Sequence, residues 1–488
     1  MSHHQPDPNK IVNLIIDGKP VTVPEGTRIL EAAKKVNVNI PTLCEHPDLC
    51  KRALCRICVV EADGRGKLIA ACANDVWEGV NIVTNNQRLF NIRKTIIELI
   101  LANHPQDCLS CIRNKKCELQ SLALSFGVGG SLFDNSFLQN GAGEHPPQIE
   151  SETLVRNMDK CVKCGRCVEV CQEIQTIRAI NTSHRSHEYE ISTPYKQALE
   201  DGTCVFCGGC AAVCPVGAIY EHDQTAEVWT SLNDSGCKTV AQVSPSFAAA
   251  LNNELSLAEG TVTTGKMIAA IKLLGFDKIY DADISANVAN SEIAGEIQQR
   301  MKNSSVKLLQ GKNLPVISGC SEGIGNFIKN SYPDLVDNLV VVKNPWRTFA
   351  SSIRTVNDKI TTVSFVPCIA QKYRIGVLEK TESPDFALTT GELARMINLA
   401  GIVIETLPEE AFEPQPSQAN QRFAGEGSPL DVIGFDPPNL NNSGLSVKKE
   451  VVYGFENARR IMETIRGGKC DAQWVEIYSC PGSCHVES

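Results

Sequence analysis

The 488-residue sequence contains no apolar run that approaches the about 18 residues a transmembrane helix needs. It also lacks an excess of positive charge, since 47 Lys and Arg stand against 56 Asp and Glu, a formal net charge of −9. Nucleic-acid-binding proteins need a basic face, so this balance argues against one. The polar segment MSHHQPDPNK has no apolar signal-peptide core. We therefore expect a cytoplasmic protein without membrane insertion.

A complete nucleotide-binding motif is also missing. No G-x-G-x-x-G fingerprint or flavin motif occurs. The segment GTVTTGKM fits a P-loop until its last position, where Met267 replaces the Ser or Thr that reaches magnesium. We interpret residues 263–265 as the start of a helix, and we expect nucleotide chemistry to lie on other chains.

Cysteine, by contrast, is abundant, with 22 residues. In a long chain of a reducing compartment, cysteines indicate metal ligands more than disulfides. A first set follows two short strand patterns around Asp17-Gly18 and a helical pattern at 29–36. Its members are Cys44, Cys55, Cys58 and Cys72. Four thiolates suit soft iron and complete a 2Fe–2S cluster, with zinc as the alternative.

A second set combines one imidazole with three thiols after an apolar helical pattern at 92–104. Its members are His104, Cys108, Cys111 and Cys117, spaced H-x3-C-x2-C-x5-C. Such ligands bind zinc or a 4Fe–4S cluster. A histidine ligand would raise the cluster's potential, because a neutral group replaces an anionic one.

The most specific signal is a repeated C-x2-C-x2-C-x3-C run. The first run is Cys161, Cys164, Cys167 and Cys171, and the second is Cys204, Cys207, Cys210 and Cys214. In two-cluster ferredoxins the fourth Cys of each run ligates the other cluster. We therefore predict one 4Fe–4S cluster on Cys161, Cys164, Cys167 and Cys214, and another on Cys204, Cys207, Cys210 and Cys171.

This order of clusters resembles the large iron–sulfur subunit of complex I-type NADH dehydrogenases. It also resembles the FeFe hydrogenases, especially the subunit of multimeric NAD-linked and electron-bifurcating enzymes. The second half separates these families, because TVAQVSPSFAAALNNE, VPCIAQKYR, GELARMINLAGI and WVEIYSCPGSC resemble the FeFe-hydrogenase catalytic domain. This resemblance implies that His104 ligates the 4Fe–4S cluster of the second set.

The resemblance implies a multidomain fold of mixed α+β and α/β class. We predict a β-grasp 2Fe–2S ferredoxin domain at 1–95 and a His/Cys-ligated segment with a linker at 96–150. A two-cluster ferredoxin domain at 151–228 and an FeFe-hydrogenase-like α/β domain at 229–488 complete the chain. The alternation of strand patterns with helical patterns in the last domain favours α/β.

The resemblance also implies which residues of the last domain would hold a hydrogen-activating site. The family motif TSCCPxW reads SGCSEGI here, so Cys320 remains but the second cysteine, a cube ligand, is Ser321. The motif PCxxK keeps Cys368 but replaces its lysine with Gln371, beside Lys372. The motif ExMxCxxGC keeps Cys480 and Cys484 but replaces its methionine with Tyr478.

We infer that the two-iron unit of the hydrogen site is lost. A fourth 4Fe–4S cube on Cys320, Cys368, Cys480 and Cys484 is one outcome, and an empty structural domain is another. A working hydrogen site is the third.

The sequence thus predicts an electron-transferring subunit of an NAD(P)H- and ferredoxin-linked oxidoreductase complex, with one 2Fe–2S and three 4Fe–4S clusters. The resemblance implies an NADH-oxidising flavoprotein, a small 2Fe–2S subunit and ferredoxin as partners. A nickel–iron hydrogenase or formate dehydrogenase would supply the terminal reaction. The alternatives are a catalytic FeFe hydrogenase with an atypical cluster, and a redox-sensing or docking scaffold.

Overall fold

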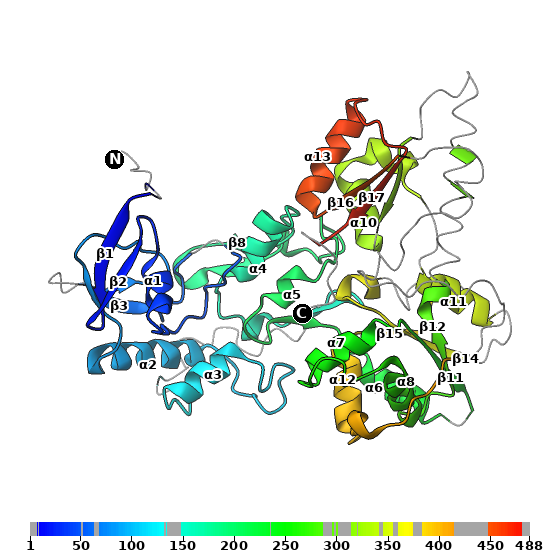
Figure 1. Cartoon of the computed structure of the whole chain (residues 1–488), viewed down its shortest axis with the longest axis horizontal. Coiled ribbons are helices and arrows are strands. Elements are labelled where there is room, and N and C mark those ends of the chain that lie inside the picture. The colour runs from blue at the N-terminus through cyan, green and yellow to red at the C-terminus, as the bar shows by residue number, and fades with distance from the viewer. Residues whose placement is uncertain are drawn as a thin grey trace.

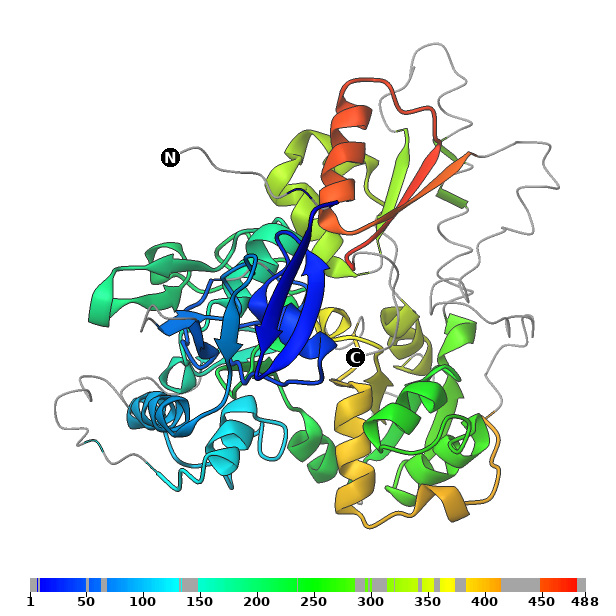
Figure 2. The same cartoon turned by 60° about the vertical axis from the view of Figure 1, so that its left-hand side comes forward.

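The computed structural model describes residues 7, 9–49, 52–62, 68–130, 133, 148–234, 236–285, 295–296, 299–300, 314–319, 321–340, 345–354, 360–373, 383–413 and 448–480. Two predicted ligands, Cys320 and Cys484, lie outside these ranges. Figures 1 and 2 show an N-terminal unit (residues 9–83), a middle unit (148–221) and two C-terminal lobes. The middle unit lies between the N-terminal unit and both lobes.

The N-terminal unit is a five-stranded sheet in the order β2-β1-β5-β3-β4. Its elements are β1 (Ile11–Ile16), β2 (Lys19–Pro24), α1 (Ile29–Lys35), β3 (Val59–Ala62), β4 (Leu68–Ala70) and β5 (Asn81–Val83). β1 and β2 pair antiparallel around Asp17 and Gly18, whose φ angles of 48° and 78° are those of a tight two-residue hairpin turn. The predicted hairpin and helix are confirmed.

Two helices follow the sheet, α2 (Gln87–Ala102) and α3 (Glu118–Ser125). The Asn86 side chain accepts a hydrogen bond from the Leu89 N–H and so caps α2. The helix predicted at 92–104 is therefore confirmed, but it begins earlier, directly after this cap. Cys117 caps α3 through its sulfur, which accepts from the Gln120 N–H at 3.5 Å.

The middle unit carries both cysteine runs between its outer strands. Its strands are β6 (Gln148–Ile149), β7 (Leu154–Arg156), β8 (Asn181–Ser183), β9 (Glu190–Ser192) and β10 (Ile219–Glu221). Its short helices are η2 (Met158–Lys160), α4 (Arg166–Glu169), η3 (Val170–Ile174), η4 (Ser186–Glu188), η5 (Pro194–Lys196) and α5 (Gly209–Ala212). β7 pairs with β10. Gly165 and Gly208 precede α4 and α5 with φ of 82° and 77°, so the repeat in sequence is also a repeat in backbone.

The C-terminal lobe at the lower right of Figure 1, here called the lower lobe, is built on a parallel sheet in the order β12-β11-β14-β15. Its strands are β11 (Lys238–Val243), β12 (Lys278–Asp281), β14 (Ile360–Phe365) and β15 (Phe386–Leu388). Its helices are α6 (Thr225–Leu232), α7 (Phe247–Glu254), α8 (Thr264–Leu273), α11 (Pro345–Arg354), η7 (Ile369–Lys372), α12 (Thr390–Leu399) and η8 (Ile404–Thr406). Helices pack against both faces, as a parallel sheet requires.

The C-terminal lobe at the upper right of Figure 1, here called the upper lobe, contains a second parallel sheet in the order β13-β17-β16. Its elements are β13 (Val316–Gly319), α10 (Glu322–Ser331), η6 (Pro333–Asn338), β16 (Lys449–Tyr453), α13 (Phe455–Arg466) and β17 (Trp474–Tyr478). The two parallel sheets with their helices confirm the α/β class predicted for the last domain.

Two hydrophobic cores cross the borders between units. The larger core, here called the shared core, joins Val205 and Phe206 of the middle unit to Phe327, Phe455 and Ile477 of the upper lobe. A second core joins Leu43 and Ile57 of the N-terminal unit to α2 and to Val216. The middle unit is therefore packed against its neighbours on both sides by buried apolar side chains.

The P-loop-like segment has a structural explanation. Thr263 caps α8, and its hydroxyl donates to Glu409 Oε1 at 2.6 Å. A Cβ atom at Gly265 would lie 2.0 Å from Glu409 Oε2, so glycine is needed for this carboxylate to reach the helix. A carboxylate of the chain itself therefore lies at this helix N-terminus, and the predicted helix start is confirmed.

Within the described ranges, no helix combines the length and apolar character that a membrane crossing needs.

Candidate metal centres

The first predicted ligand set lies beside the N-terminal sheet, where the four thiols form a chain of contacts. Cys58 Sγ and Cys72 Sγ are 3.3 Å apart, and the Cys44 thiol hydrogen-bonds with Cys55 and Cys72. Hydrogen bonds from Cys55 and then Cys72 lower the pKa of Cys44 to about 2, while the contact with Cys44 raises the pKa of Cys55. A hydrogen bond from Cys72 also lowers the pKa of Cys58 to about 7, whereas the contacts with Cys44 and Cys58 raise the pKa of Cys72. Two iron ions would supply the positive charge that four thiolates need.

The second set lies in the loop between α2 and α3. His104 Nδ1 is buried and has no hydrogen-bond partner among the described atoms. Burial lowers the pKa of His104, and the charge of Lys160 lowers it further, so the imidazole is in the neutral form that binds metals. Burial also raises the pKa of Cys117, and negative charge on Cys111 or Cys108 would raise it further. These groups fit a His/Cys-ligated cluster.

The third set shows the crossed arrangement expected from the repeat. Cys161, Cys164, Cys167 and Cys214 line one pocket together with apolar side chains. Cys214 comes from the second run, so the structure brings together the predicted ligands of one cluster. Burial raises the pKa of Cys161 to about 11 and that of Cys164 to about 12. Such thiols become thiolates only beside a compensating positive charge.

The fourth set lies toward the upper lobe, partly buried against the shared core. Burial raises the pKa of Cys210, and charges on Cys207, Cys204 and Cys171 raise it further, so the predicted four are neighbours. Cys171 accepts a hydrogen bond from the Ala179 N–H at 3.2 Å, and Cys204 accepts from the Phe206 N–H at 3.4 Å. Backbone N–H groups of this kind stabilise the reduced state of a cluster.

Among the described residues, no three His, Cys, Asp or Glu side chains form a group that would hold a single metal ion.

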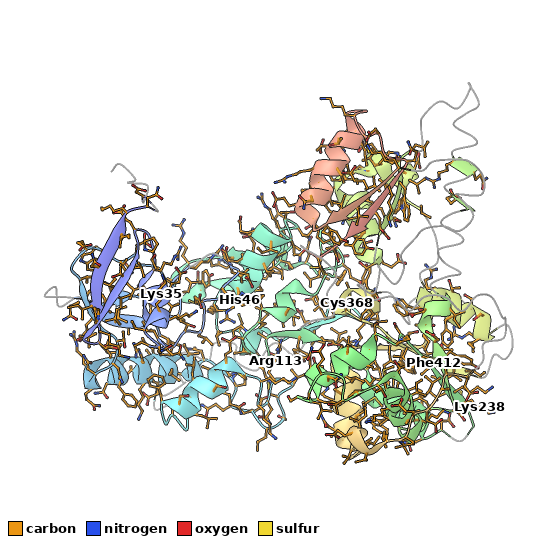
Figure 3. All side chains as sticks on the ribbon, in the orientation of Figure 1. Lys35, His46, Arg113, Lys238, Cys368 and Phe412 are labelled. Atoms are coloured by element: carbon orange, nitrogen blue, oxygen red, sulfur yellow. The ribbon has the colours of Figure 1, made fainter. Side chains whose placement is uncertain are left out.

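The surviving C-terminal motifs lie against the fourth set. A Cβ atom at Gly208 would lie 1.8 Å from Cγ2 of Ile369, the residue after Cys368, and Figure 3 shows Cys368 near α5. A Cβ atom at Gly323 would lie 2.2 Å from the Val205 carbonyl oxygen. Negative charge on Cys480 contributes, after burial and Cys171, to the raised pKa of Cys207. Of the four predicted C-terminal ligands, the structure therefore brings Cys368 and Cys480 to the middle unit.

The residues that replace family positions do not fit a two-iron unit. The Ser321 hydroxyl is buried, has no hydrogen-bond partner among the described atoms, and offers a hard oxygen in place of a soft thiolate. Tyr478 is 2% exposed, and its ring lies 5.0 Å from the ring of Tyr453, which stands opposite it in β16.

Lys372 is not available as a substitute for the missing lysine. Its Nζ donates to Glu392 Oε1 and Oε2 at 2.7 and 2.9 Å, and to the His222 carbonyl at 2.6 Å. It also lies 3.3 Å from Glu221 Oε1. The side chains of Lys372 and Glu392 are both 0% exposed. Lys372 therefore joins the lower lobe to the middle unit, and moving it would leave two carboxylates unpaired.

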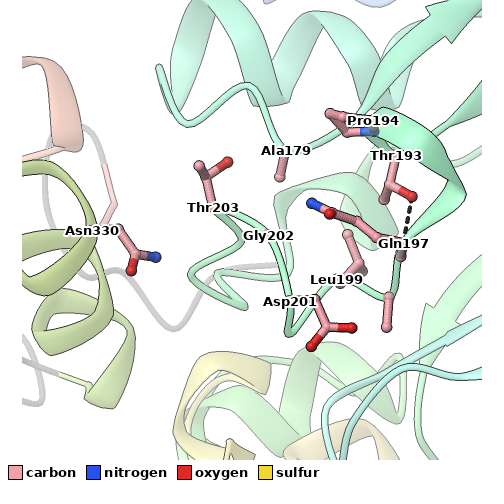
Figure 4. A pocket seen from close by; sticks show the side chains of 10 residues that line it. Ala179, Thr193, Pro194, Gln197, Leu199, Asp201, Gly202, Thr203 and Asn330 are labelled. Atoms are coloured by element: carbon pink, nitrogen blue, oxygen red, sulfur yellow. Dashed lines mark hydrogen bonds between the residues drawn. The ribbon is translucent and has the colours of Figure 1, made fainter.

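A pocket lies between the middle unit and α10 (Figure 4). Asn330 of α10 faces Gln197 and Thr203 across it. Asp201 is the only ionisable residue that lines this pocket.

Comparison with known families identifies the domains. Residues 237–486, more than half of the chain, match "Iron only hydrogenase large subunit, C-terminal domain". The chain belongs to the iron-only hydrogenase large-subunit family. Residues 9–87 match a 2Fe-2S iron-sulfur cluster binding domain, and residues 93–131 match the NADH-ubiquinone oxidoreductase-G iron-sulfur binding region. Residues 151–220 match the ferredoxin-like domain of NADH-quinone oxidoreductase subunit 3. The predicted resemblance is confirmed.

Two curated relatives align with nearly the whole chain, and a third aligns with less than half of it. NADP-reducing hydrogenase subunit HndD of Solidesulfovibrio fructosivorans is 32% identical over 97% of this chain and 88% of its own. Iron hydrogenase 1 of Clostridium pasteurianum is 29% identical over 96% of this chain and 87% of its own. NADPH-Fe(3+) oxidoreductase subunit alpha of Geobacter sulfurreducens is 34% identical over 43% of this chain and 24% of its own.

Sequence reasoning missed the ion-pair partners of Lys372. The sequence indicates only that Glu392 is the last residue of a T-x-x-E capping box. In the structure Glu392 does cap α12, because its carboxylate accepts a hydrogen bond from the Thr389 N–H at 2.7 Å. Nothing in the sequence indicates that the same carboxylate binds Lys372, because the two residues meet only through the tertiary fold. The matches identify domains and not ligands, so the individual ligand assignments remain predictions.

Proposed function

We propose that this chain transfers electrons within a multisubunit NAD(P)-linked hydrogenase or related oxidoreductase complex and does not itself activate hydrogen. Its relatives include a subunit of an NADP-reducing hydrogenase, which supports the complex and its NAD(P) linkage. The chain would hold one 2Fe–2S and three 4Fe–4S clusters on the ligand sets described above. We place it in the cytoplasm, where reducing conditions keep its thiols available.

The observation that carries this proposal is the contact between the fourth ligand set and the C-terminal motifs. Ile369 lies against Gly208, and Gly323 lies against Val205, so the C-terminal motifs lie against residues next to the predicted ligands Cys207 and Cys204. Electrons that reach this cluster are therefore delivered to the C-terminal domain. Lys372 is buried in an ion pair there, and Ser321 replaces a thiolate, which favours a relay or docking role over hydrogen chemistry.

The partners follow from what the chain lacks. A flavoprotein with a small 2Fe–2S subunit would exchange electrons with NAD(P)H, and ferredoxin would be a second electron partner. A nickel–iron hydrogenase or formate dehydrogenase would complete the reaction beside the C-terminal domain. The second candidate function is a catalytic FeFe hydrogenase, which the family membership favours. The third is a docking or redox-sensing scaffold.

Infrared spectroscopy on the anaerobic complex, made with the hydrogenase maturation proteins, separates these functions. CO and cyanide bands from this chain would overturn the relay and establish a hydrogen-activating site. Without such bands, about 18 irons on the isolated chain indicate a relay with a C-terminal cube, and about 14 indicate an empty domain.

Cysteine variants test the relay within the complex. Cys204→Ser should lower electron transfer between the partner subunits but leave NADH-dependent dye reduction by the flavoprotein unchanged. If the C-terminal cube exists, Cys368→Ser should have the same effect. Unchanged turnover with Cys204→Ser would contradict the relay and favour the scaffold.

A further inference from the structure

Lys372, Glu392 and Glu221, here called the Lys372 cluster, place two carboxylates around one ammonium group at the border of two units. Glu392 accepts two hydrogen bonds from Lys372, one from the Thr389 N–H and one from the Gln224 N–H. Glu221 lies 3.3 Å from Lys372 and accepts from the Thr389 hydroxyl at 2.6 Å. With both carboxylates ionised, the cluster carries one unbalanced negative charge in a buried site.

Lys372 and Glu221 both belong to elements that lie close to predicted cluster ligands. Lys372 ends η7, which begins directly after Cys368, and Ile369 of η7 packs against Gly208 between Cys207 and Cys210. Glu221 ends β10, which contacts α5, the helix that carries Cys210 of the fourth ligand set. A negative charge added to the fourth ligand set would therefore act on these carboxylates through a poorly screened interior.

The cluster also has one connection to water. The side chain of Glu221 is 28% exposed, whereas those of Lys372 and Glu392 are fully buried. A proton can therefore enter at Glu221 and pass to Glu392 through the Lys372 ammonium group, since all three share hydrogen bonds. No large opening of the fold is needed.

Two of the other carboxylates near Glu392 are paired. Asp223 pairs with Arg395 at 2.9 Å. Glu254 on α7, which packs against α12, pairs with Lys116 at 3.3 Å. Burial, followed by the charge of Lys372, lowers the pKa of His222, so this histidine is neutral. Glu227 and Glu152 also act on His222, so they add negative charge beside the Lys372 cluster and do not neutralise it.

We propose that the Lys372 cluster is a proton-binding site that takes up one proton from water when the neighbouring cluster on Cys204, Cys207, Cys210 and Cys171 accepts one electron. The electron comes from a low-potential one-electron donor, such as a reduced flavin in the complex, and the proton binds a carboxylate of Glu392 or Glu221. Oxidation of the cluster returns both. This proposal rests on the proposed electron-transfer function, because it requires a redox-active cluster at that site.

Burial raises the pKa of Glu392 to about 8, with Lys372 acting in the opposite direction. The carboxyl group therefore changes its protonation state near neutral pH. Below that value the site is already protonated in the oxidised protein, and electron transfer needs no proton. Above it, each electron brings a proton.

The test is a redox titration of the full, cluster-loaded chain with dithionite, followed by electron paramagnetic resonance between about pH 6 and pH 10. The Cys204→Ser variant identifies which signal belongs to the fourth ligand set. The potential of that cluster should be constant at low pH and should fall by about 59 mV per pH unit above the bend. In Glu392→Gln the pH dependence should disappear, and the high-pH potential should be more positive.

Glu221→Gln gives a second variant if Glu392→Gln does not fold, and it should also abolish the slope. Asp334 is an exposed carboxylate paired with Arg466 in the upper lobe, and Asp334→Asn is the matched control. In this variant the potential should depend on pH as it does in the wild type. A difference infrared spectrum on reduction at high pH should show a new carboxylic-acid band that Glu392→Gln or Glu221→Gln removes.

A pH-independent potential in the wild type, or a slope that persists in both glutamine variants, would overturn the proton site. Either result would leave the electron-transfer function standing, because the cluster signal would still be present. Absence of that signal from the wild type would overturn both proposals.

Discussion

At the scale of single residues, Lys372 lies one position after the site of the family's conserved motif lysine, and it makes different contacts. The family motif places its lysine where this chain has Gln371, and the next residue, Lys372, points into an ion pair with Glu392. The sequence shows both residues but not their directions. A shift of one position therefore cannot restore the missing contact, because Lys372 is held by a bidentate ion pair and a backbone carbonyl.

At about pH 9, where Glu392 is ionised, Lys372→Met should destabilise the protein by about 3–5 kcal/mol, because it leaves the buried Glu392 carboxylate without a counter-charge. Urea unfolding followed by fluorescence would measure the effect. The double variant Lys372→Met with Glu392→Gln should recover part of the loss. Lys448→Met, an exposed lysine paired with Asp471, is the control and should unfold like the wild type. Equal midpoints for Lys372→Met and the control would contradict the buried ion pair.

Gly208 offers a second residue-scale prediction. Its φ of 77° makes Gly208→Ala cost about 1–2 kcal/mol in backbone strain alone. Gly260→Ala is the matched control, because Gly260 has φ of 79° but open space where a Cβ would stand. Gly208→Ala should lower the thermal midpoint more than Gly260→Ala, since its methyl group would also displace Ile369. Equal shifts would mean that the two loops are not in contact.

At the scale of elements, α12 connects local capping with long-range charge. Glu392 closes the capping box at the start of α12 and also binds Lys372 of η7. A carboxyl group whose pKa is raised on folding stabilises the folded state when it is protonated, and this contribution decreases as pH rises through the folded pKa.

The wild-type protein should therefore lose stability between about pH 5 and about pH 8, the window between the ordinary and raised pKa of Glu392. Glu392→Gln should remove this part of the pH dependence, because an amide does not titrate. Urea midpoints at both ends of the window measure it. Glu254→Gln, whose side chain is 22% exposed and paired with Lys116, should keep the wild-type profile.

The elements were largely predictable where the sequence repeats a local pattern. Asp17-Gly18 specified a hairpin, and the alternating residues of β1 specified its buried face. The repeated runs predicted a crossed ligand set, and Cys214 does line the pocket of the first run. The contact of Ile369 with Gly208 was not predictable, since the two residues are far apart in the chain. The Lys372–Glu392 pair was not predictable either, because it joins η7 to the start of α12 and depends on how these two elements pack.

At the scale of the whole molecule, the middle unit is structurally continuous with its neighbours. The shared core includes Val205 and Phe206 from the middle unit and Phe327 and Phe455 from the upper lobe. The ring of Phe206 also stacks on Tyr373 at 4.3 Å between centroids. The ferredoxin-like part is thus not a tethered module that docks and releases.

A chain ending at residue 228 should therefore be aggregation-prone, because it exposes the apolar side chains that the lobes cover. Binding of a hydrophobic dye such as ANS, compared with the full-length chain, would measure this exposure. Phe206→Ser in the truncated chain should reduce dye binding. A monomeric truncated chain with no more dye binding than the full-length protein would contradict the shared core.

The shared core also limits which deletions in the C-terminal half the protein can tolerate. A catalytic domain whose motifs have changed would ordinarily be free to shorten or disappear. Here its removal would strip the cover from Val205 and Phe206, which lie among the predicted ligands of the last cluster. Deletions in the second half would therefore be selected against even if that half performed no reaction, while its surface-facing residues would remain free to vary.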